Sequence, residues 1–283
     1  MADETLISWA DHTHNHWIGC ARVSPACDGC YAAHLMETRM GRVQWGGPGK
    51  GQGTRSFTSV SNRRKPLTWD RKAAKAGTRP FVFCSSLADV FDNQVPTEWR
   101  ADLFDLIRKT PNLIWLLLTK RPQLIVKLSE AAGGLPANAA IGTTVEDQDR
   151  FDINVPALRK AKRLTFPAFT FLSCEPLLGP LIGSFHEIDW VITGGETDQG
   201  QHKARPTNPQ WFRDIRDQCA AAGIPYHHKQ NGEWVSVSEV AGDGPHFRFP
   251  DGRTVRRIGK HRTGRTIDGA THDAFPAIRR AAV

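Results

Sequence analysis

The sequence lacks long apolar runs and a basic leader segment. Its longest apolar stretches, such as Leu113–Leu118, have the length of a β-strand, far short of the roughly 18 residues that indicate a transmembrane helix. The opening segment, MADETLISWADHTHNHW, is acidic and then rich in histidine, without the basic start and apolar centre of a signal peptide. We therefore expect a cytoplasmic protein with no membrane partner.

The chain also lacks the cysteine density of a small disulfide-stapled protein, because it has six cysteines in 283 residues. With 40% hydrophobic and 23% charged residues, its composition is that of an ordinary globular protein. This excludes a wholly disordered chain, a collagen and a coiled-coil rod. In a reducing compartment the thiols stay free, so clustered cysteines indicate a metal site or redox chemistry.

Positive charge is unevenly placed along the chain. The formal net charge is +8, and the segment from His246 to Val283 holds nine Lys or Arg against three acidic residues, a net +6. Such a basic segment predicts a polyanionic partner such as nucleic acid. The simpler alternative is a solvated basic surface that keeps the protein soluble.

Short apolar runs alternate with amphipathic helical stretches through most of the sequence. This pattern predicts an α/β fold, a full or partial (β/α) barrel with mostly parallel strands, with a doubly wound open sheet as the alternative. We expect a barrel domain over residues 1–235 and a basic C-terminal extension over 236–283, with a hairpin at Asp251-Gly252. Residues 41–66 look like a long loop. The expected strands lie near residues 7–19, 81–84, 114–118, 139–142, 170–173, 190–193 and 225–228.

Polar residues follow each expected strand. Because the carboxyl ends of parallel strands meet at one edge of the sheet, these residues should converge there, although single members can equally be helix caps or turns. The set comprises Ser85, Ser86, Asp89, Thr119, Lys120, Arg121, Thr143, Thr144, Glu146, Ser173, Glu175, Gly194, Gly195, Glu196, Lys229 and Gln230.

Three of the six cysteines are clustered: Cys20, Cys27 and Cys30. One interpretation is a tetrahedral zinc site, with His34 or one of His12, His14 and His16 as the fourth ligand. A second is a 4Fe–4S cluster held by three cysteines, which leaves one iron open to a small ligand. A third is a set of buried or redox-active thiols. Spacing alone leaves these alternatives open.

Six motifs together carry a resemblance over nearly the whole chain: WIGCARVSPACDGCYA, FVFCSSLADVF, WLLLTKRP, SCEPLLGP, DWVITGGET and KHRTGRTIDG. The chain resembles a phage and bacterial family of unassigned function that is described by its three-cysteine motif. That family is similar to radical S-adenosylmethionine (SAM) iron–sulfur enzymes, and more distantly to spore photoproduct lyase, which repairs a thymine dimer in DNA. The resemblance implies two cofactors, a 4Fe–4S cluster and SAM.

The resemblance also implies roles for particular residues. Cys20, Cys27 and Cys30 match the cluster ligands. Gly194, Gly195 and Glu196 resemble the element that holds the SAM amino group, and Ser85 and Ser86 are the alternative for that role. Thr119 stands beside them as a further cofactor-binding candidate, Lys120 and Arg121 suit an anionic group, and Glu175 suits the ribose hydroxyls. Cys84 and Cys174 are hydrogen-donor candidates by position, and the catalytic candidates are Lys120, Glu175 and Cys174.

The leading functional hypothesis is a radical-SAM enzyme that acts on a nucleic-acid base or nucleotide and takes electrons from an external donor. We expect the 41–66 loop and the basic 246–265 hairpin to border the cavity and contact phosphates. One alternative is a zinc-stabilised nucleic-acid-binding protein without catalysis. The other is a barrel phosphoesterase with Glu175 and Glu196 as acid and base.

Overall fold

A parallel sheet of seven strands forms the centre of the computed structural model, which describes residues 5–279. Each strand pairs with the next one along the chain; Phe83, for example, lies opposite Leu116. The strands are β1 (His12–His14), β6 (Phe81–Cys84), β7 (Ile114–Thr119), β8 (Ala139–Thr144), β9 (Thr170–Cys174), β10 (Trp190–Gly194) and β11 (Tyr226–Gln230).

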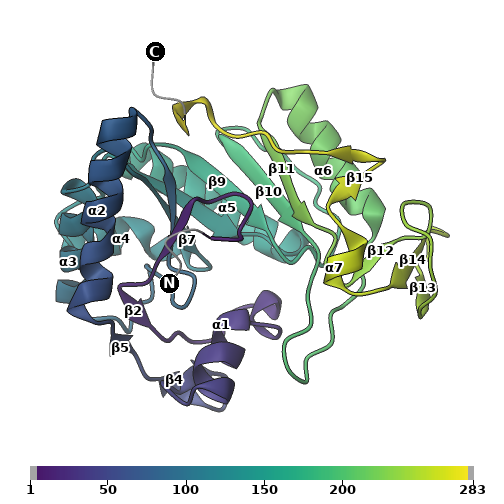
Figure 1. Cartoon of the computed structure of the whole chain (residues 1–283), viewed down its shortest axis with the longest axis horizontal. Coiled ribbons are helices and arrows are strands. Elements are labelled where there is room, and N and C mark those ends of the chain that lie inside the picture. Colours follow the sequence, from purple (N-terminus) through teal and green to yellow (C-terminus); the bar gives the residue numbers. More distant parts are fainter. Residues whose placement is uncertain (1–4, 280–283) are drawn as a thin grey trace.

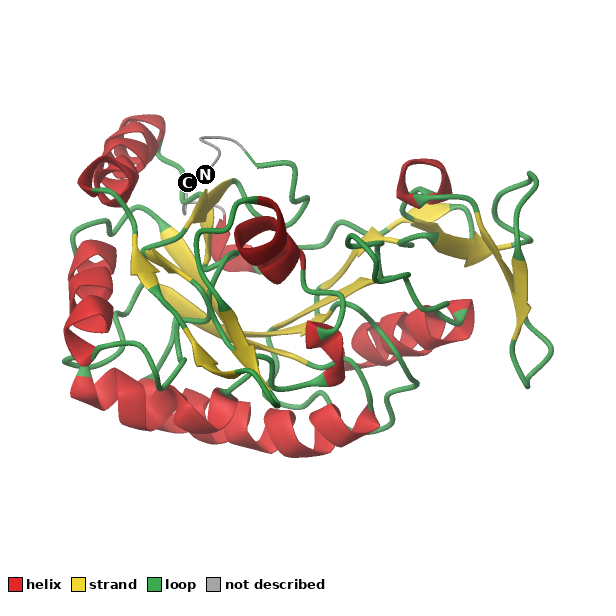
Figure 2. Ribbon diagram, turned by 90° about the horizontal axis from the view of Figure 1, so that it is seen from below, coloured by secondary structure: helices red, strands yellow, loops and turns green. Residues whose placement is uncertain are grey.

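The sequential strand order confirms the partial-barrel prediction. A doubly wound sheet reverses its strand order at a switch point, and this sheet does not, so that alternative is wrong. The sheet is curved, and β1 and β11 remain unpaired with each other in the part of the chain that the structure describes (Figures 1 and 2). All seven carboxyl ends therefore lie along one edge of an open half-barrel.

Helices cover the outer, convex face of this sheet (Figure 2). Side-chain caps fix where several of them begin: Ser59, Asp147 and Asn208 each accept a backbone N–H in the first turn of the helix that follows. The connection between β9 and β10 contains no helix. The helices are α2 (Val60–Ala76), α3 (Thr97–Arg108), α4 (Ile125–Ala131), α5 (Gln148–Thr165) and α6 (Pro209–Ala222).

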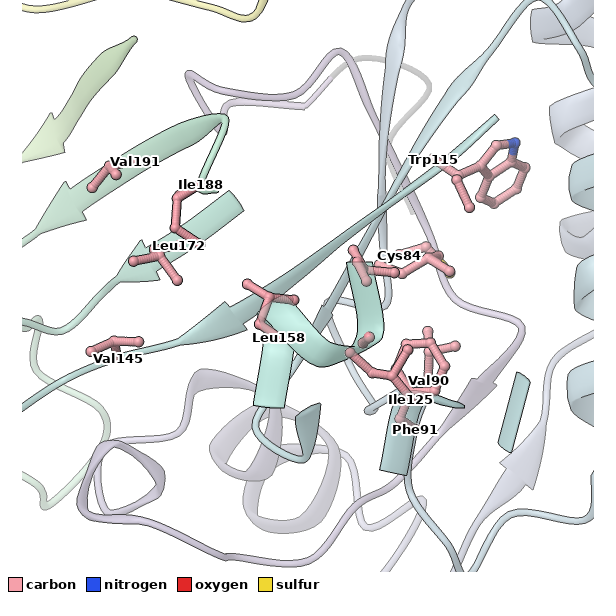
Figure 3. Packing of buried hydrophobic residues seen from close by; sticks show 14 of the residues in the cluster. Cys84, Val90, Phe91, Trp115, Ile125, Val145, Leu158, Leu172, Ile188 and Val191 are labelled. Atoms are coloured by element: carbon pink, nitrogen blue, oxygen red, sulfur yellow. The ribbon is translucent and has the colours of Figure 1, made fainter. Parts of the chain in front are cut away.

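Both faces of the sheet are apolar, as in other parallel sheets. Side chains that alternate along each strand belong to two separate clusters: Phe81 and Phe171 face the concave side, whereas Val82 and Leu172 face the helices. Figure 3 shows part of the outer cluster, including Cys84, Trp115 and Leu172. Because the two faces are both buried, the polar groups of the barrel concentrate at the strand ends.

The predicted loop 41–66 contains more structure than expected. It forms the strands β3 (Trp45–Gly47), β4 (Gly51–Gly53) and β5 (Ser56–Phe57), and α2 already begins at Val60. β3 and β4 form a tight antiparallel hairpin, in which Gly49 and Gly51 adopt positive φ angles that favour glycine. The glycine-rich composition therefore reports a hairpin here. β5 pairs with β2 (Trp17–Ile18).

The C-terminal hairpin prediction is confirmed. β13 (His246–Arg248) and β14 (Thr254–Arg257) pair antiparallel around the Asp251-Gly252 turn, and β12 (Trp234–Ser236) joins them, so that β12 spans the expected boundary at 235/236. Beyond α7 (Lys260–Thr263), β15 (Thr266–Ile267) and β16 (Ala270–Thr271), the chain returns to the barrel. There the Ala274 carbonyl accepts the indole N–H of Trp190 at 3.0 Å.

The helices that the structure describes are all too short or too polar to cross a membrane.

Candidate functional site

The three clustered cysteines lie on one loop that follows β1 and β2. Cys20 comes soon after β2, Cys27 ends the 3-10 turn η1 (Pro25–Cys27), and Cys30 precedes α1 (Tyr31–Ala33), which continues into the π-helix η2 (His34–Arg39). Gly19 opens the loop with a φ of +101°, and a Cβ there would lie 2.2 Å from the Thr54 carbonyl oxygen. The loop can therefore begin only with glycine. We call residues 19–30 the cysteine loop.

A cavity of about 130 Å³ brings these cysteines together with the ends of three strands. It is several times larger than one water molecule and smaller than the roughly 300–1,000 Å³ typical of whole-ligand sites. Of the predicted site residues, its lining includes Cys20, Cys27, Cys30, Ser85, Ser86, Thr119 and Lys120; Ala21, Val23, Ala32, Trp45, Phe83, Ala88, Asp89, Leu118, Arg121 and Thr144 complete it.

Thiols are the metal-binding groups on this cavity. In the described part of the chain, no three His, Cys, Asp or Glu side chains are arranged to hold a single metal ion, and no histidine lines the cavity. His12 stacks on Trp69 with ring centroids 4.4 Å apart, and His16 bonds to Asp102 at 2.9 Å. In a 4Fe–4S cluster each thiolate binds a different iron, so the sulfurs surround a volume rather than a point. A cavity lined by three thiols fits that group.

Asp89, after β6, ties the end of β7 to the cysteine loop. Its carboxylate accepts hydrogen bonds from the Thr119 hydroxyl at 2.7 Å, the Lys120 backbone N–H at 3.1 Å and Arg121 Nη1 at 3.0 Å. Arg121 in turn lies 3.5 Å from Cys20 Sγ and donates to the Ala21 carbonyl at 3.0 Å. Because Asp89 and Arg121 are both buried, this ion pair fixes Cys20 rigidly.

Lys120 is the cation nearest to the other two cysteines. Burial alone would lower the pKa of Lys120, but the charges of acidic neighbours, Cys27 and Cys30 first among them, outweigh burial and raise it. Burial raises the pKa of Cys20 to about 12 and also raises that of Cys30. Thiolates in this cavity therefore depend on a nearby positive charge, which Lys120 and Arg121 supply.

Glu196 holds the cysteine loop through Arg205. The Glu196 carboxylate accepts two side-chain bonds from Arg205, at 2.5 and 2.9 Å, and one from its backbone N–H at 2.7 Å. Arg205 then donates to the Pro25 carbonyl at 3.1 Å and lies 3.6 Å from Asp28. Burial by itself would raise the pKa of Glu196, but Arg205 outweighs it and lowers that pKa. The carboxylate is thus already paired with a cation of the chain.

Glu175 lies at the end of β9, outside the cysteine cavity lining. Its Oε2 accepts a hydrogen bond from Lys229 at 2.6 Å, whereas Oε1 is buried without a partner in the described residues. A Cβ at Gly194 would lie 3.2 Å from Glu175 Cγ, so the glycine leaves room for this side chain. Gly195 is equally constrained, because a Cβ there would lie 2.0 Å from the Asn231 carbonyl oxygen. These two glycines admit neighbouring protein groups.

Cys84 and Cys174 do not reach the cavity. Both belong to the outer cluster between the sheet and the helices and are fully buried there. Burial raises the pKa of Cys84 to about 12 and that of Cys174 well above its usual value. Along β9 the side chain of Cys174 points to the same face as Leu172, opposite Phe171 on the concave face. The structure therefore separates Cys174 from the other candidate residues.

The match to a known family runs over residues 4–276, and that family is described as a protein of unknown function, DUF5131. The chain belongs to the DUF5131 family. No curated protein and no solved structure matches it.

In this DUF5131 chain, two anchoring residues carry no sequence signal for their role. Arg205 lies in the β10–α6 loop, and nothing in its neighbourhood marks it as the partner of Glu196. Glu146 was one of many polar strand ends, yet its Oε1 accepts the Ala26 backbone N–H of the cysteine loop at 3.1 Å, and its Oε2 is buried without a partner in the described residues. Contacts between segments more than 100 residues apart are decided by the fold.

Proposed function

We propose that this DUF5131 protein is a radical-SAM iron–sulfur enzyme that acts on a nucleic-acid base or nucleotide. The observation that carries the proposal is the cavity at the carboxyl edge of the half-barrel, where three thiols of one loop meet the polar ends of β6, β7 and β8. In β/α folds this edge is where active sites are built. No other cavity described in the structure is lined by these thiols.

A bound cluster would supply one electron to SAM and so cleave its sulfonium bond to a carbon radical. Cys20, Cys27 and Cys30 would hold that cluster. Arg121 fixes Cys20 through its 3.5 Å contact with Sγ. Lys120, buried beside Cys27 and Cys30, is placed to bind an anionic group such as a carboxylate.

Hydroxyl groups on the same lining provide further hydrogen bonds. Ser85, Ser86 and Thr119 lie on the cavity, so they are the candidates to orient SAM within the proposed site. The paired state of Glu196 assigns it to positioning the cysteine loop rather than to binding the SAM amino group. Glu175, with one buried oxygen unpartnered, retains an acceptor for a ribose hydroxyl.

Ion pairing weighs against the phosphoesterase alternative. Glu175 is bound to Lys229 and Glu196 to Arg205, so both carboxylates stay ionised and neither is poised as a general acid.

The choice of a nucleic-acid substrate rests on charge beside the cysteine loop. Arg39, Arg42 and Lys50 are exposed and have no ion-pair partner among residues 5–279. The nearby acid Glu37 accepts the Trp45 backbone N–H at 2.9 Å. Such a basic rim suits phosphate contacts outside a pocket that receives a base.

The 246–265 hairpin has a smaller part in this proposal than the sequence indicated. None of its residues lines the cysteine cavity, and Figure 1 shows β13 and β14 well separated from α1. Arg253 pairs with Asp251, and Arg257 pairs with Asp198. The phosphate contacts are therefore assigned to Arg39, Arg42 and Lys50.

Anaerobic reconstitution tests the cofactor assignment. The intact protein, supplied with iron and sulfide, should bind about four irons per chain and, with SAM and dithionite, release 5′-deoxyadenosine. A variant with Cys20, Cys27 and Cys30 all changed to Ala should bind none, whereas Cys219→Ala in the outer core should match the intact protein. One zinc per chain and no iron would overturn the proposal.

Salt-dependent binding tests the substrate class separately. Changing Arg39, Arg42 and Lys50 to Ala should weaken single-stranded DNA binding at least about tenfold and reduce the slope of log affinity against log salt by roughly 2. The hairpin variant Arg248→Ala, Arg253→Ala, Arg256→Ala removes the same charge and should have a smaller effect. If binding is insensitive to salt, the substrate is not a nucleic acid.

A further inference from the structure

A second cavity, of about 430 Å³, lies between α2 and α3 and shares no lining residue with the cysteine cavity. We propose that this cleft binds a phosphate group, carried either by a free nucleotide or by the end of a nucleic-acid strand. Its volume is within the usual range for a small-molecule site. Its walls come from the end of β1, from α2 and from α3, and we call it the α2–α3 cleft. Its lining residues are His16, Val60, Arg63, Arg64, Leu67, Asp102, Leu106 and Lys109.

Positive charge dominates the α2–α3 cleft. Its lining has three cations, Arg63, Arg64 and Lys109, and one carboxylate, Asp102. Burial lowers the pKa of His16 to about 4, so this ring is neutral near pH 7 and adds no charge. The cleft therefore carries a net charge of about +2.

The single carboxylate is already bound. Asp102 Oδ2 accepts hydrogen bonds from His16 Nε2 at 2.9 Å and from Arg63 Nη1 at 3.0 Å. Arg64 and Lys109 have no ion-pair partner within the described part of the chain. Two cations thus remain to bind an anion that enters the cleft.

Arg63 is held in place before any ligand arrives. Its Nε donates to the Thr58 carbonyl at 3.2 Å, and its guanidinium lies 4.0 Å above the Phe57 ring, which stacks on Trp99. Behind Asp102, His14 and His16 are hydrogen-bonded to each other at 3.1 Å. A fixed guanidinium loses little conformational entropy on binding, and its planar fork suits phosphate oxygens.

The remaining walls are apolar. Val60, Leu67 and Leu106 line the cleft, and Val60 is 52% exposed. A ligand with a flat apolar part beside its phosphate would cover these side chains. This combination favours a nucleotide or a terminal nucleotide over a bare inorganic anion.

Titration calorimetry on metal-free protein at low salt tests the inference independently of the proposed cluster. The probes are inorganic phosphate, adenosine 5′-monophosphate and a short 5′-phosphorylated oligonucleotide. The Arg64→Ala, Lys109→Ala variant should bind at least tenfold more weakly to whichever phosphate probe the intact protein binds best. The matched control is Lys72→Ala, Lys75→Ala, which removes two exposed lysines of α2 outside the cleft and should change affinity less than twofold.

A third variant should move affinity in the opposite direction. Asp102→Asn keeps an oxygen acceptor for His16 and removes the only negative charge of the cleft, so phosphate should bind several-fold more tightly. Preference for the monophosphate identifies a free nucleotide as the ligand, and preference for the oligonucleotide identifies a strand end. The inference is overturned if no probe binds at millimolar concentration, or if the control weakens binding as much as the cleft variant.

Discussion

The six cysteines of this chain divide into two sets with the same side chain and different surroundings. Cys20, Cys27 and Cys30 lie on a loop at the carboxyl edge of the sheet, where they line a cavity beside Lys120 and Arg121. The other set, Cys84, Cys174 and Cys219, is buried among apolar side chains between the sheet and the helices.

The difference shows that strand geometry decides what a thiol can do. Cys174 comes at the end of a strand, directly before Glu175, yet alternation turns its side chain toward α6 and away from the strand-end groups. The loop cysteines have no such constraint, and anchors from three strand ends, at Arg121, Glu146 and Glu196, determine their placement.

Removing Asp89 should have the largest effect on the loop set. Asp89→Ala leaves the buried Arg121 guanidinium without its carboxylate and should lower the free energy of unfolding by roughly 3–5 kcal/mol, measured by urea denaturation. The control Asp105→Ala removes an exposed partner of Arg108 and should cost under about 1 kcal/mol. Equal losses in the two variants would contradict a rigid anchor at Cys20.

Arg205→Ala should loosen the cysteine loop while leaving the core cysteines unchanged. Without Arg205, the tether to Pro25 is lost and Glu196 is left unpaired. In metal-free protein, alkylation of Cys27 and Cys30, followed by mass spectrometry, should become about tenfold faster, equivalent to roughly 1.4 kcal/mol. The rate at Cys174 serves as an internal reference, and Arg253→Ala as a surface control; an unchanged rate at Cys27 would remove Arg205 as an anchor.

Alkaline pH should destabilise the protein through its core thiols. Burial raises the pKa of Cys219 from its usual value near 9 to about 12, so the unfolded chain releases this proton first. This stability is fully present below pH 9 and is lost as pH rises toward 12. Between pH 8 and 10 the contribution is about 1.4 kcal/mol. Cys219→Ala should flatten the pH dependence of urea unfolding by that amount, and an identical pH dependence would contradict the assignment.

Cys174→Ala should have the smallest effect of these changes. It removes one buried sulfur from the outer core and should cost about 1 kcal/mol of unfolding free energy. Iron content after reconstitution should equal that of the intact protein, because Cys174 is outside the cavity. A large loss of iron in this variant would erase the distinction between the two cysteine sets.

Much of the fold could be predicted from the sequence. Apolar runs such as Leu113–Leu118 coincide with strands, because a strand buried on both faces needs consecutive apolar residues. The hairpin at Asp251-Gly252 was predicted from local turn chemistry. The segment 41–66 was misread as a loop, because its glycines serve a hairpin that pairs residues only a few positions apart.

The sequence by itself determined the parallel sheet, the loop that carries three cysteines and the set of polar strand ends, since each depends on residues close together along the chain. Tertiary structure alone decided which of those strand ends surround the thiols. It brought Ser85, Thr119 and Lys120 to the cavity, occupied Glu196 with Arg205 and turned Cys174 into the core. The physical reason is that side-chain direction and long-range ion pairs follow from how the strands curve and twist together, which no local pattern encodes.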